Sequence, residues 1–147
     1  MQRSHAHRLS GFTLLELLVV LVILGLLAAY VGPRYFGQLG KAESKSAQTQ
    51  INAFGKALDA YRLDTGSYPS TAQGLMALYQ KPTQINNWFG PYLDKPPPAD
   101  PWGRAYEYRS PGQHGEYDLF TLGKDASPGG DAENADITSW APVGNSR

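Results

Sequence analysis

The stretch Ser10-Gly11-Phe12-Thr13-Leu14-Leu15-Glu16-Leu17-Leu18 opens an apolar run that continues without a break through residues 19–31. From Phe12 to Val31 only Thr13 and Glu16 are clearly polar. A helix of about 20 apolar residues, at a rise of ~1.5 Å per residue, spans the ~30 Å hydrocarbon core of a bilayer. The run therefore predicts a transmembrane helix. A carboxylate inside such a helix is costly and usually functional.

A short polar leader precedes the apolar run. It comprises residues 1–11, carries Arg3 and Arg8, and ends in Gly11. The positive-inside rule places both arginines in the cytoplasm. The chain after Val31 is therefore expected on the other side of the membrane.

Simpler interpretations of the same residues remain open. Gly11 could merely mark the start of a helix, and Thr13-Leu14-Leu15-Glu16 fits a capping box, which would be compatible with cleavage of the leader. An ordinary secretory signal peptide has an apolar core of only ~7–15 residues and ends at a small-x-small site. The run here is longer, and Leu27-Ala28-Ala29-Tyr30 is a poor match to such a site.

Composition narrows the classes of function. The chain has 147 residues, which suits one domain besides the membrane segment, and its formal net charge is zero. It shows no basic surplus and no nucleic-acid-binding motif, so no nucleic-acid partner is expected. Cysteine is absent, and His114 is the only histidine outside the leader. With no Walker-A, GxSxG or HExxH pattern either, the sequence favours a protein that is not an enzyme.

The N-terminal residues resemble the signal of type IV prepilins. The resemblance rests on the polar leader, on Gly11 at its end, on Phe12 after it, and on Glu16 at the fifth position of the chain left after cleavage. It implies that a prepilin peptidase cuts between Gly11 and Phe12 and that Phe12 is then N-methylated. It also implies an assembly role for Glu16, which would pair with the amino group of a neighbour's Phe12 and so compensate both charges in a low-dielectric bundle.

The pattern changes after the apolar run. Pro33 would kink a helix that continues past it. From Tyr35 to Asp64 apolar residues recur at helical spacing, which predicts an amphipathic half that covers a globular head. Gly66 is the expected C-cap. The predicted core stripe consists of Ala47, Ile51, Phe54, Leu58 and Tyr61.

Shorter elements are expected in the head. A helix capped by Ser70 or Thr71 is predicted to run to Tyr79, and a proline-rich but packed loop covers residues 83–102. Residues 104–109 and 116–122 alternate as strands around a Pro-Gly turn and predict a hairpin. The last 25 residues are expected to be loop.

Motifs along the head narrow the resemblance to the major pseudopilin family of type II secretion systems, the general secretion pathway protein G family. In chain order they are Thr65-Gly66-x-Tyr68-Pro69, Thr71-x-x-Gly74-Leu75, Asp100-Pro101-Trp102-Gly103-x-x-Tyr106-x-Tyr108, Thr121-Leu122-Gly123-x-Asp125 and Ala135-Asp136-Ile137-x-x-Trp140. The family implies an α+β, type IV pilin-like fold. A long kinked N-terminal helix would carry a small antiparallel β-sheet head and a C-terminal calcium-binding loop. The expected divisions are a leader (1–11), a transmembrane and assembly helix (12–33, with Pro33) and a periplasmic head (34–147).

The acidic loop of residues 122–136 holds four acids and one base. Calcium takes six to eight oxygen ligands from carboxylates and backbone carbonyls. The spacing is not that of an EF-hand, so the residues alone favour a solvated acidic loop over a calcium site. The family resemblance implies a calcium site at Leu122, Asp125, Asp131 and Asp136, with Glu133 as an alternative to Asp131.

The resemblance also implies a function. The chain would be the major structural subunit of a periplasmic pseudopilus, anchored in the inner membrane by a single pass before it polymerises with itself. Minor pseudopilins, the prepilin peptidase and the inner-membrane assembly platform would be its partners. Two alternatives remain: a type IV or competence pilin, which a C-terminal cysteine pair would have favoured, and a periplasmic binding module or enzyme that is merely anchored by one helix.

Overall fold

The computed structural model describes residues 11–141. The chain forms two compact units, residues 1–37 and residues 38–147, and each is described by itself. The leader arginines, Arg3 and Arg8, lie outside the described residues.

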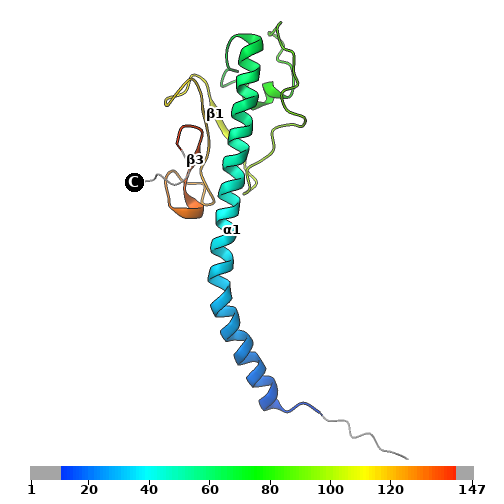
Figure 1. Cartoon of the computed structure of the whole chain (residues 1–147), viewed down its shortest axis with the longest axis vertical. Coiled ribbons are helices and arrows are strands. Elements are labelled where there is room, and N and C mark those ends of the chain that lie inside the picture. Colours follow the sequence, from blue (N-terminus) through cyan, green and yellow to red (C-terminus); the bar gives the residue numbers. More distant parts are fainter. Residues whose placement is uncertain (1–10, 142–147) are drawn as a thin grey trace, which may run out of the picture. The chain divides into compact units, whose positions relative to one another are not determined.

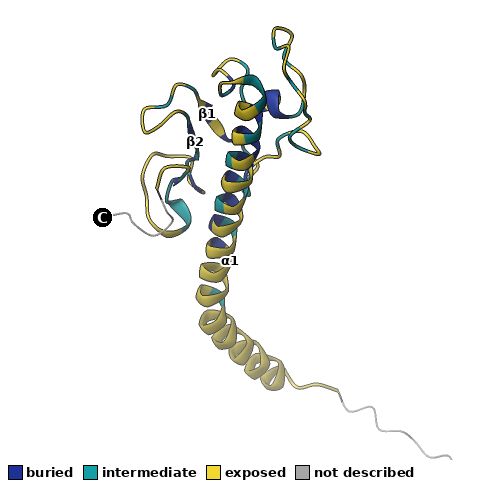
Figure 2. Cartoon of the chain, turned by 45° about the horizontal axis from the view of Figure 1, so that its top comes forward, coloured by how far each residue is buried: buried dark blue, intermediate teal, exposed yellow. Residues whose placement is uncertain are grey.

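The long helix α1 spans Leu14–Thr65 and has 52 residues, close to the expected length of about 50. Pro33 lies inside α1, as predicted, where its ring removes one backbone N–H donor. The first half of α1 is long and apolar enough to cross a membrane. Every residue from 12 to 31 is exposed, which Figure 2 shows as an unbroken yellow stretch. Nothing else in the described chain covers these apolar side chains.

The second half of α1 carries the core of the head. The five residues of the predicted stripe are all buried, with exposures between 0% and 2%. Phe54 packs edge-on against Tyr106, with ring centroids 5.3 Å apart. Gly66 ends the helix with φ of 85°, and its N–H donates to the Arg62 carbonyl. The predicted amphipathic stripe and its cap are therefore confirmed.

A short 3-10 helix and a packed loop follow α1. The helix η1 spans Leu75–Leu78, so the expected helix to Tyr79 is wrong in type and too long. Gly74, which precedes η1, has φ of 59°. A residue in that conformation interrupts a right-handed helix, so only one turn forms. The loop after η1 packs as predicted, because Trp88 and Tyr92 lie partly buried against the core.

Three short strands form one antiparallel sheet in the order β1-β2-β3. Strand β1 spans Glu107–Arg109, β2 spans Asp118–Thr121 and β3 spans Ile137–Thr138. The predicted hairpin is confirmed with narrower bounds. Strand β3 lies in the segment expected to be entirely loop, so that expectation is wrong.

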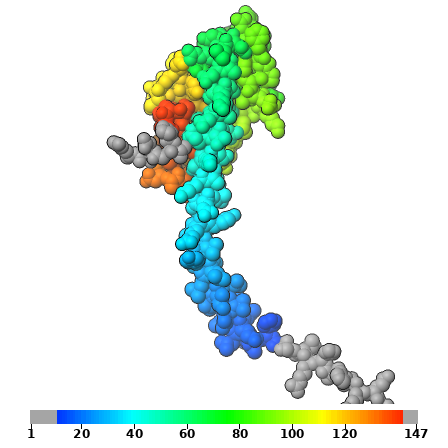
Figure 3. Space-filling view, viewed as in Figure 1, coloured from blue at the N-terminus to red at the C-terminus, as the bar shows by residue number. Residues whose placement is uncertain are grey.

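The head is arranged around the second half of α1. The sheet lies on one side of the helix, and η1 with the proline-rich loop lies on the other (Figure 1). Figure 3 shows the orange and red segments after β2 packed directly against the cyan part of α1. The acidic loop thus lies beside α1, with Glu133 against Gly40 and residues 124–132 exposed.

The turn of the β1–β2 hairpin is fixed to the end of the head. Asp118 is buried and accepts hydrogen bonds from the N–H groups of Gln113 (2.9 Å) and His114 (3.1 Å). The His114 ring stacks on Trp140 with centroids 4.0 Å apart and an interplanar angle of 4°. Trp140 belongs to the Asp-Ile-x-x-Trp motif, which therefore has a packing role.

Candidate functional site

The N-terminal candidate residues form a capping box. The Glu16 carboxylate accepts hydrogen bonds from the N–H (2.9 Å) and the hydroxyl (3.1 Å) of Thr13, and the Glu16 N–H donates to that hydroxyl (3.2 Å). Gly11 has open space around it, and the Phe12 side chain is 89% exposed. The proposed cleavage junction thus lies in an accessible, non-helical segment just before α1.

The acidic loop connects β2 to β3, two neighbouring strands of the sheet. Its neck is closed by hydrogen bonds from the Lys124 N–H to the Glu133 carbonyl (3.0 Å) and from the Asp136 N–H to the Gly129 carbonyl (3.2 Å). Because β2 and β3 pair, the chain must leave and return at one place. The loop is therefore a closed unit with a defined entry and exit.

Backbone strain gathers in this loop. Ala126 (φ 59°) and Ala132 (φ 53°) are the non-glycine residues with positive φ in the described chain, and both belong to the loop. Left-handed backbone costs a non-glycine residue roughly 1–2 kcal/mol. Strain of this kind clusters at active sites and ligand clamps, where the surrounding structure maintains it.

The structure gives the four acids different surroundings. Asp125 is exposed, and its carboxylate accepts the Ser127 N–H at 3.1 Å. Asp131 is exposed and precedes the 3-10 helix η2 (Ala132–Asn134) without making a capping hydrogen bond. Glu133 is occupied, because its carboxylate pairs with the Lys124 ammonium at 3.1 Å. Between the two alternatives, Asp131 is the acid left without an ionic partner in the described chain.

The two carboxylate oxygens of Asp136 have different surroundings, and this difference is the strongest support for a cation site. Its Oδ2 accepts the Gly129 N–H at 2.9 Å. Its Oδ1 is buried and has no hydrogen-bond partner among residues 11–141. An unpaired buried carboxylate oxygen is costly, and a hard cation is one group that would compensate it.

The predicted ligands share one loop but do not form a preassembled carboxylate cage. Among residues 11–141, no group of three Asp, Glu, His or Cys side chains lies close enough to hold a metal ion. A cation here would need backbone carbonyls and water besides Asp125 and Asp136. Calcium accepts such mixed oxygen shells. The residues present therefore fit calcium better than zinc, which prefers nitrogen and sulfur ligands.

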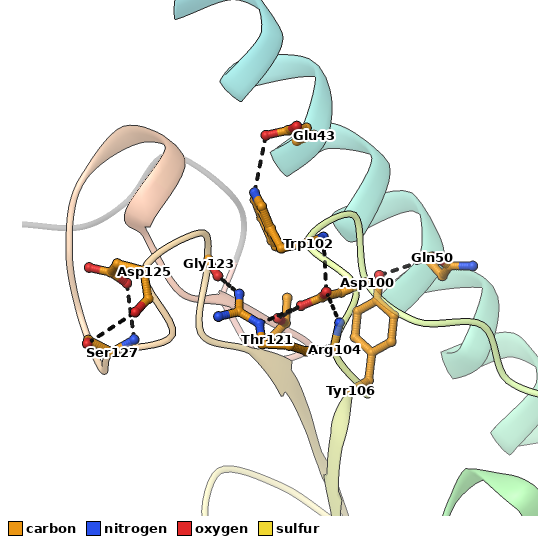
Figure 4. A network of polar contacts seen from close by, with 10 residues as sticks. All are labelled: Glu43, Gln50, Asp100, Trp102, Arg104, Tyr106, Thr121, Gly123, Asp125 and Ser127. Carbon is orange, nitrogen blue, oxygen red and sulfur yellow. Dashed lines mark hydrogen bonds and ion pairs between the residues drawn. The ribbon is translucent and has the colours of Figure 1, made fainter. Parts of the chain in front are cut away.

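A buried polar network beside the loop was missed by reasoning from the sequence. Asp100 is 4% exposed, and its Oδ1 accepts the N–H groups of Trp102 (3.1 Å) and Arg104 (2.8 Å). The Thr121 hydroxyl donates to Asp100 Oδ2, and the Arg104 guanidinium donates to the Gly123 carbonyl. Figure 4 shows these side chains converging between the sheet and α1.

Two further side chains tie this network to α1. The Trp102 indole N–H donates to the Glu43 carboxylate at 3.1 Å, and the Tyr106 hydroxyl donates to Gln50 at 3.2 Å. Burial raises the pKa of Tyr106 to about 12, and the charge of Asp100 adds to the shift. Tyr106 therefore stays protonated and remains a donor at neutral pH. An Asp before Pro-Trp-Gly is a turn signal in the sequence, but its distant partners are not.

Known proteins resemble the chain along nearly its whole length. Residues 34–140 match the family model described as "Type II secretion system (T2SS), protein G", and residues 7–32 match the "Prokaryotic N-terminal methylation motif". The chain is 50% identical over 134 residues to the "Type II secretion system core protein G" of Vibrio cholerae, covering 89% of this chain and 91% of that protein. The protein of that name from Pseudomonas aeruginosa is 48% identical over 134 residues, covering 89% and 94%.

A solved structure supports the fold. The crystal structure of the major pseudopilin from the type 2 secretion system of enterohaemorrhagic Escherichia coli matches with a TM-score of 0.61 and 38% identity. The match covers 71% of this chain and 92% of that one.

Proposed function

The chain belongs to the type II secretion system protein G family, and we propose that it polymerises into a periplasmic pseudopilus that helps drive folded proteins across the outer membrane. The family is one of structural secretion pseudopilins, and in this proposal the chain acts by assembly. The observation that supports assembly most directly is the exposure of every residue from 12 to 31. These side chains need a bilayer in the protomer and neighbouring helices in the fibre.

The N-terminus prepares the chain for assembly. A prepilin peptidase cleaves between Gly11 and Phe12, and Phe12 is then N-methylated. The match of residues 7–32 to the methylation motif supports this step. Until assembly the chain is held in the inner membrane by α1, with the head in the periplasm.

Glu16 changes partners during assembly. In the single chain its carboxylate is occupied by Thr13, at 2.9 and 3.1 Å. In the fibre it pairs with the charged amino group of a neighbour's Phe12. The contact with a charged amino group compensates two opposite charges in a low-dielectric bundle, which the neutral donors of Thr13 cannot do. Minor pseudopilins and the inner-membrane assembly platform are the expected partners at the start of this process.

The acidic loop binds calcium in this proposal. The Leu122 carbonyl and the carboxylates of Asp125, Asp131 and Asp136 would hold the ion, with water and further carbonyls completing the shell. The buried Oδ1 of Asp136, which has no hydrogen-bond partner among residues 11–141, supports this assignment. The ion would supply a positive charge that compensates the acids and orders a loop with little apolar surface of its own.

Deleting the gene and complementing it tests the main proposal. Exported proteins should then accumulate in the periplasm, and the wild-type gene should restore their release into the medium. Overproduction should yield fibres that contain this chain. Unchanged secretion in the deletion strain would contradict the proposal. Loss of surface fibres with normal secretion would point to a type IV pilin instead.

A further inference from the structure

Arg104 links a buried turn to the entry of the acidic loop. Its guanidinium donates to the Gly123 carbonyl, two residues after the end of β2. The guanidinium also faces Asp100, with Nε 3.6 Å from Oδ2. The side chain thus spans two segments that are far apart in the sequence, as Figure 4 shows.

The buried carboxylate of Asp100 holds the Arg104 side chain in place. Its carboxylate is 0% exposed and is held by the N–H groups of Trp102 and Arg104. The Asp100 N–H donates to the Arg104 carbonyl at 2.7 Å, which closes the turn from the other direction. A side chain anchored in this way has little rotational freedom left to lose when a ligand binds.

Leu122 lies between two anchors from this turn. Before it, the Thr121 hydroxyl donates to Asp100; after it, the Gly123 carbonyl accepts from Arg104. Gly123 has φ of 65°, and a Cβ atom at this position would lie 2.6 Å from the Asn134 carbonyl oxygen. The peptide that presents the Leu122 carbonyl is therefore restrained on both sides and packed against the exit of the loop.

The charge of Arg104 opposes what its hydrogen bond achieves. A guanidinium close to a cation site repels the cation. Asp100 reduces this repulsion because its buried carboxylate faces the same guanidinium. The two effects predict opposite results for a neutral substitution, so an experiment can separate them.

We propose that Arg104 is the positioning residue of the calcium loop: it fixes the backbone around Leu122 before the ion arrives. The inference rests on the calcium site proposed above. Partners outside the ligand shell typically contribute about 10–100-fold to metal affinity. We expect Arg104 to act within that range, and through geometry, not charge.

Calorimetric titration of the full chain in detergent micelles with calcium chloride tests the inference. Arg104→Met removes the donor and the charge while keeping length, and should weaken calcium binding by about tenfold or more. Arg104→Lys keeps the charge but not the fork of donors, and should fall between. Arg109→Met is the matched control, because Arg109 is an exposed strand arginine paired with Glu107. It should bind calcium like the wild type.

The outcomes separate positioning from other roles. Melting temperature in chelator measures any general loss of stability, which a purely structural arginine would cause without a change in calcium affinity. Unchanged or tighter binding by folded Arg104→Met would overturn the inference and leave the calcium site standing. No calcium binding by the wild type would overturn both. If Arg104→Met does not fold, Thr121→Val removes the other anchor and should also weaken binding; wild-type affinity in that variant would contradict the inference.

Discussion

The Glu16 carboxylate folds back onto Thr13 and closes a reciprocal capping box at the start of α1, with bonds of 2.9, 3.1 and 3.2 Å. The same carboxylate therefore serves the helix of the single chain and, in our proposal, the contact between subunits. A carboxamide can replace a carboxylate in the first role but carries no charge for the second.

Glu16→Gln and Glu16→Ala separate these two roles. Both variants should insert into the membrane at wild-type levels, because removing a charge makes insertion easier. Both should fail to assemble, although Gln keeps the cap. Membrane fractionation and a secretion assay at native expression provide the measurement. Normal secretion by the Gln variant would show that Glu16 is only a capping residue.

Processing should depend on Gly11 for recognition and not for folding. Apart from its chain neighbours, no described residue has an atom within 4 Å of where a Cβ of Gly11 would lie, so Gly11→Leu should leave α1 and the head intact. We expect the variant to keep its leader in the membrane fraction, whereas the wild type begins at methylated Phe12. Intact-mass spectrometry of both proteins distinguishes these products. Gly37→Leu, which also meets open space, is the control and should be cleaved normally.

The helical spacing of apolar residues and the presence of turn-forming residues explain which elements the sequence predicts. The stripe from Ala47 to Tyr61 repeats at helical spacing over four turns, and no other element competes for those positions. The β1–β2 hairpin was visible because alternation on both sides flanks a Pro-Gly turn. Strand β3 was not visible, since its two residues, Ile137 and Thr138, are a strand only through pairing with β2.

The sequence predicts which acids belong to the site, but not how each of them is surrounded. The acids of the loop are plain in the sequence, but their surroundings depend on contacts across many residues. The Lys124 ammonium pairs with the Glu133 carboxylate, whereas the Gly129 N–H donates to one of the two carboxylate oxygens of Asp136. The Asp100–Thr121 bond joins residues 21 positions apart and follows no local rule. Such contacts are consequences of packing and leave no periodic trace.

Gly40 has no side chain, which lets the acidic loop pack closely against α1. A Cβ atom at this position would lie 2.5 Å from Oε2 and 2.9 Å from Cβ of Glu133. Gly40→Ala should therefore destabilise the head by about 1–3 kcal/mol from overpacking, offset by roughly 1 kcal/mol of helix propensity. Thermal unfolding of the full chain measures the balance.

Two comparisons make the Gly40 prediction specific. Gly37→Ala meets open space and should not destabilise the protein. Adding Glu133→Ala to Gly40→Ala should recover part of the loss, because it removes the Oε2 contact at 2.5 Å but keeps the Cβ contact at 2.9 Å. Equal melting temperatures for Gly40→Ala and Gly37→Ala would show that the loop accommodates the methyl group freely.

Asp118 should make the head sensitive to acid. Burial raises the pKa of this carboxyl, but the N–H donors of Gln113 and His114, with the His114 ring, outweigh burial and hold the pKa below its ordinary value of 3.8. Because the pKa of Asp118 is lower in the folded state than in the unfolded state, its ionised form stabilises the fold. This contribution is complete above the unfolded-state pKa. This contribution is lost as pH falls through the folded-state pKa.

Asp118→Asn tests this linkage. The variant should lose about 1–3 kcal/mol of stability at pH 7, since a hydrogen bond to a charged group is replaced by a weaker one. Its melting temperature should also fall less steeply than that of the wild type below pH 4. Glu107→Gln, on the exposed face of β1, is the control and should leave the acid slope unchanged. A wild-type slope in Asp118→Asn would contradict the prediction.

Calcium should raise the melting temperature of the full chain, because binding to the folded state alone adds stability in proportion to ln(1 + [L]/Kd). At a concentration 100 times Kd the gain is about 2.7 kcal/mol. Asp125→Ala and Asp136→Asn should each remove most of this gain, while Asp94→Asn, an exposed acid outside the loop, should keep it.

Magnesium should substitute poorly, since it demands a tight octahedral shell and releases its waters reluctantly. In cells, the two loop variants should lower the abundance of the chain and secretion together. Superimposable melting curves in calcium and in chelator would show that the loop is a solvated acidic surface, and the unpaired oxygen of Asp136 would then need another partner.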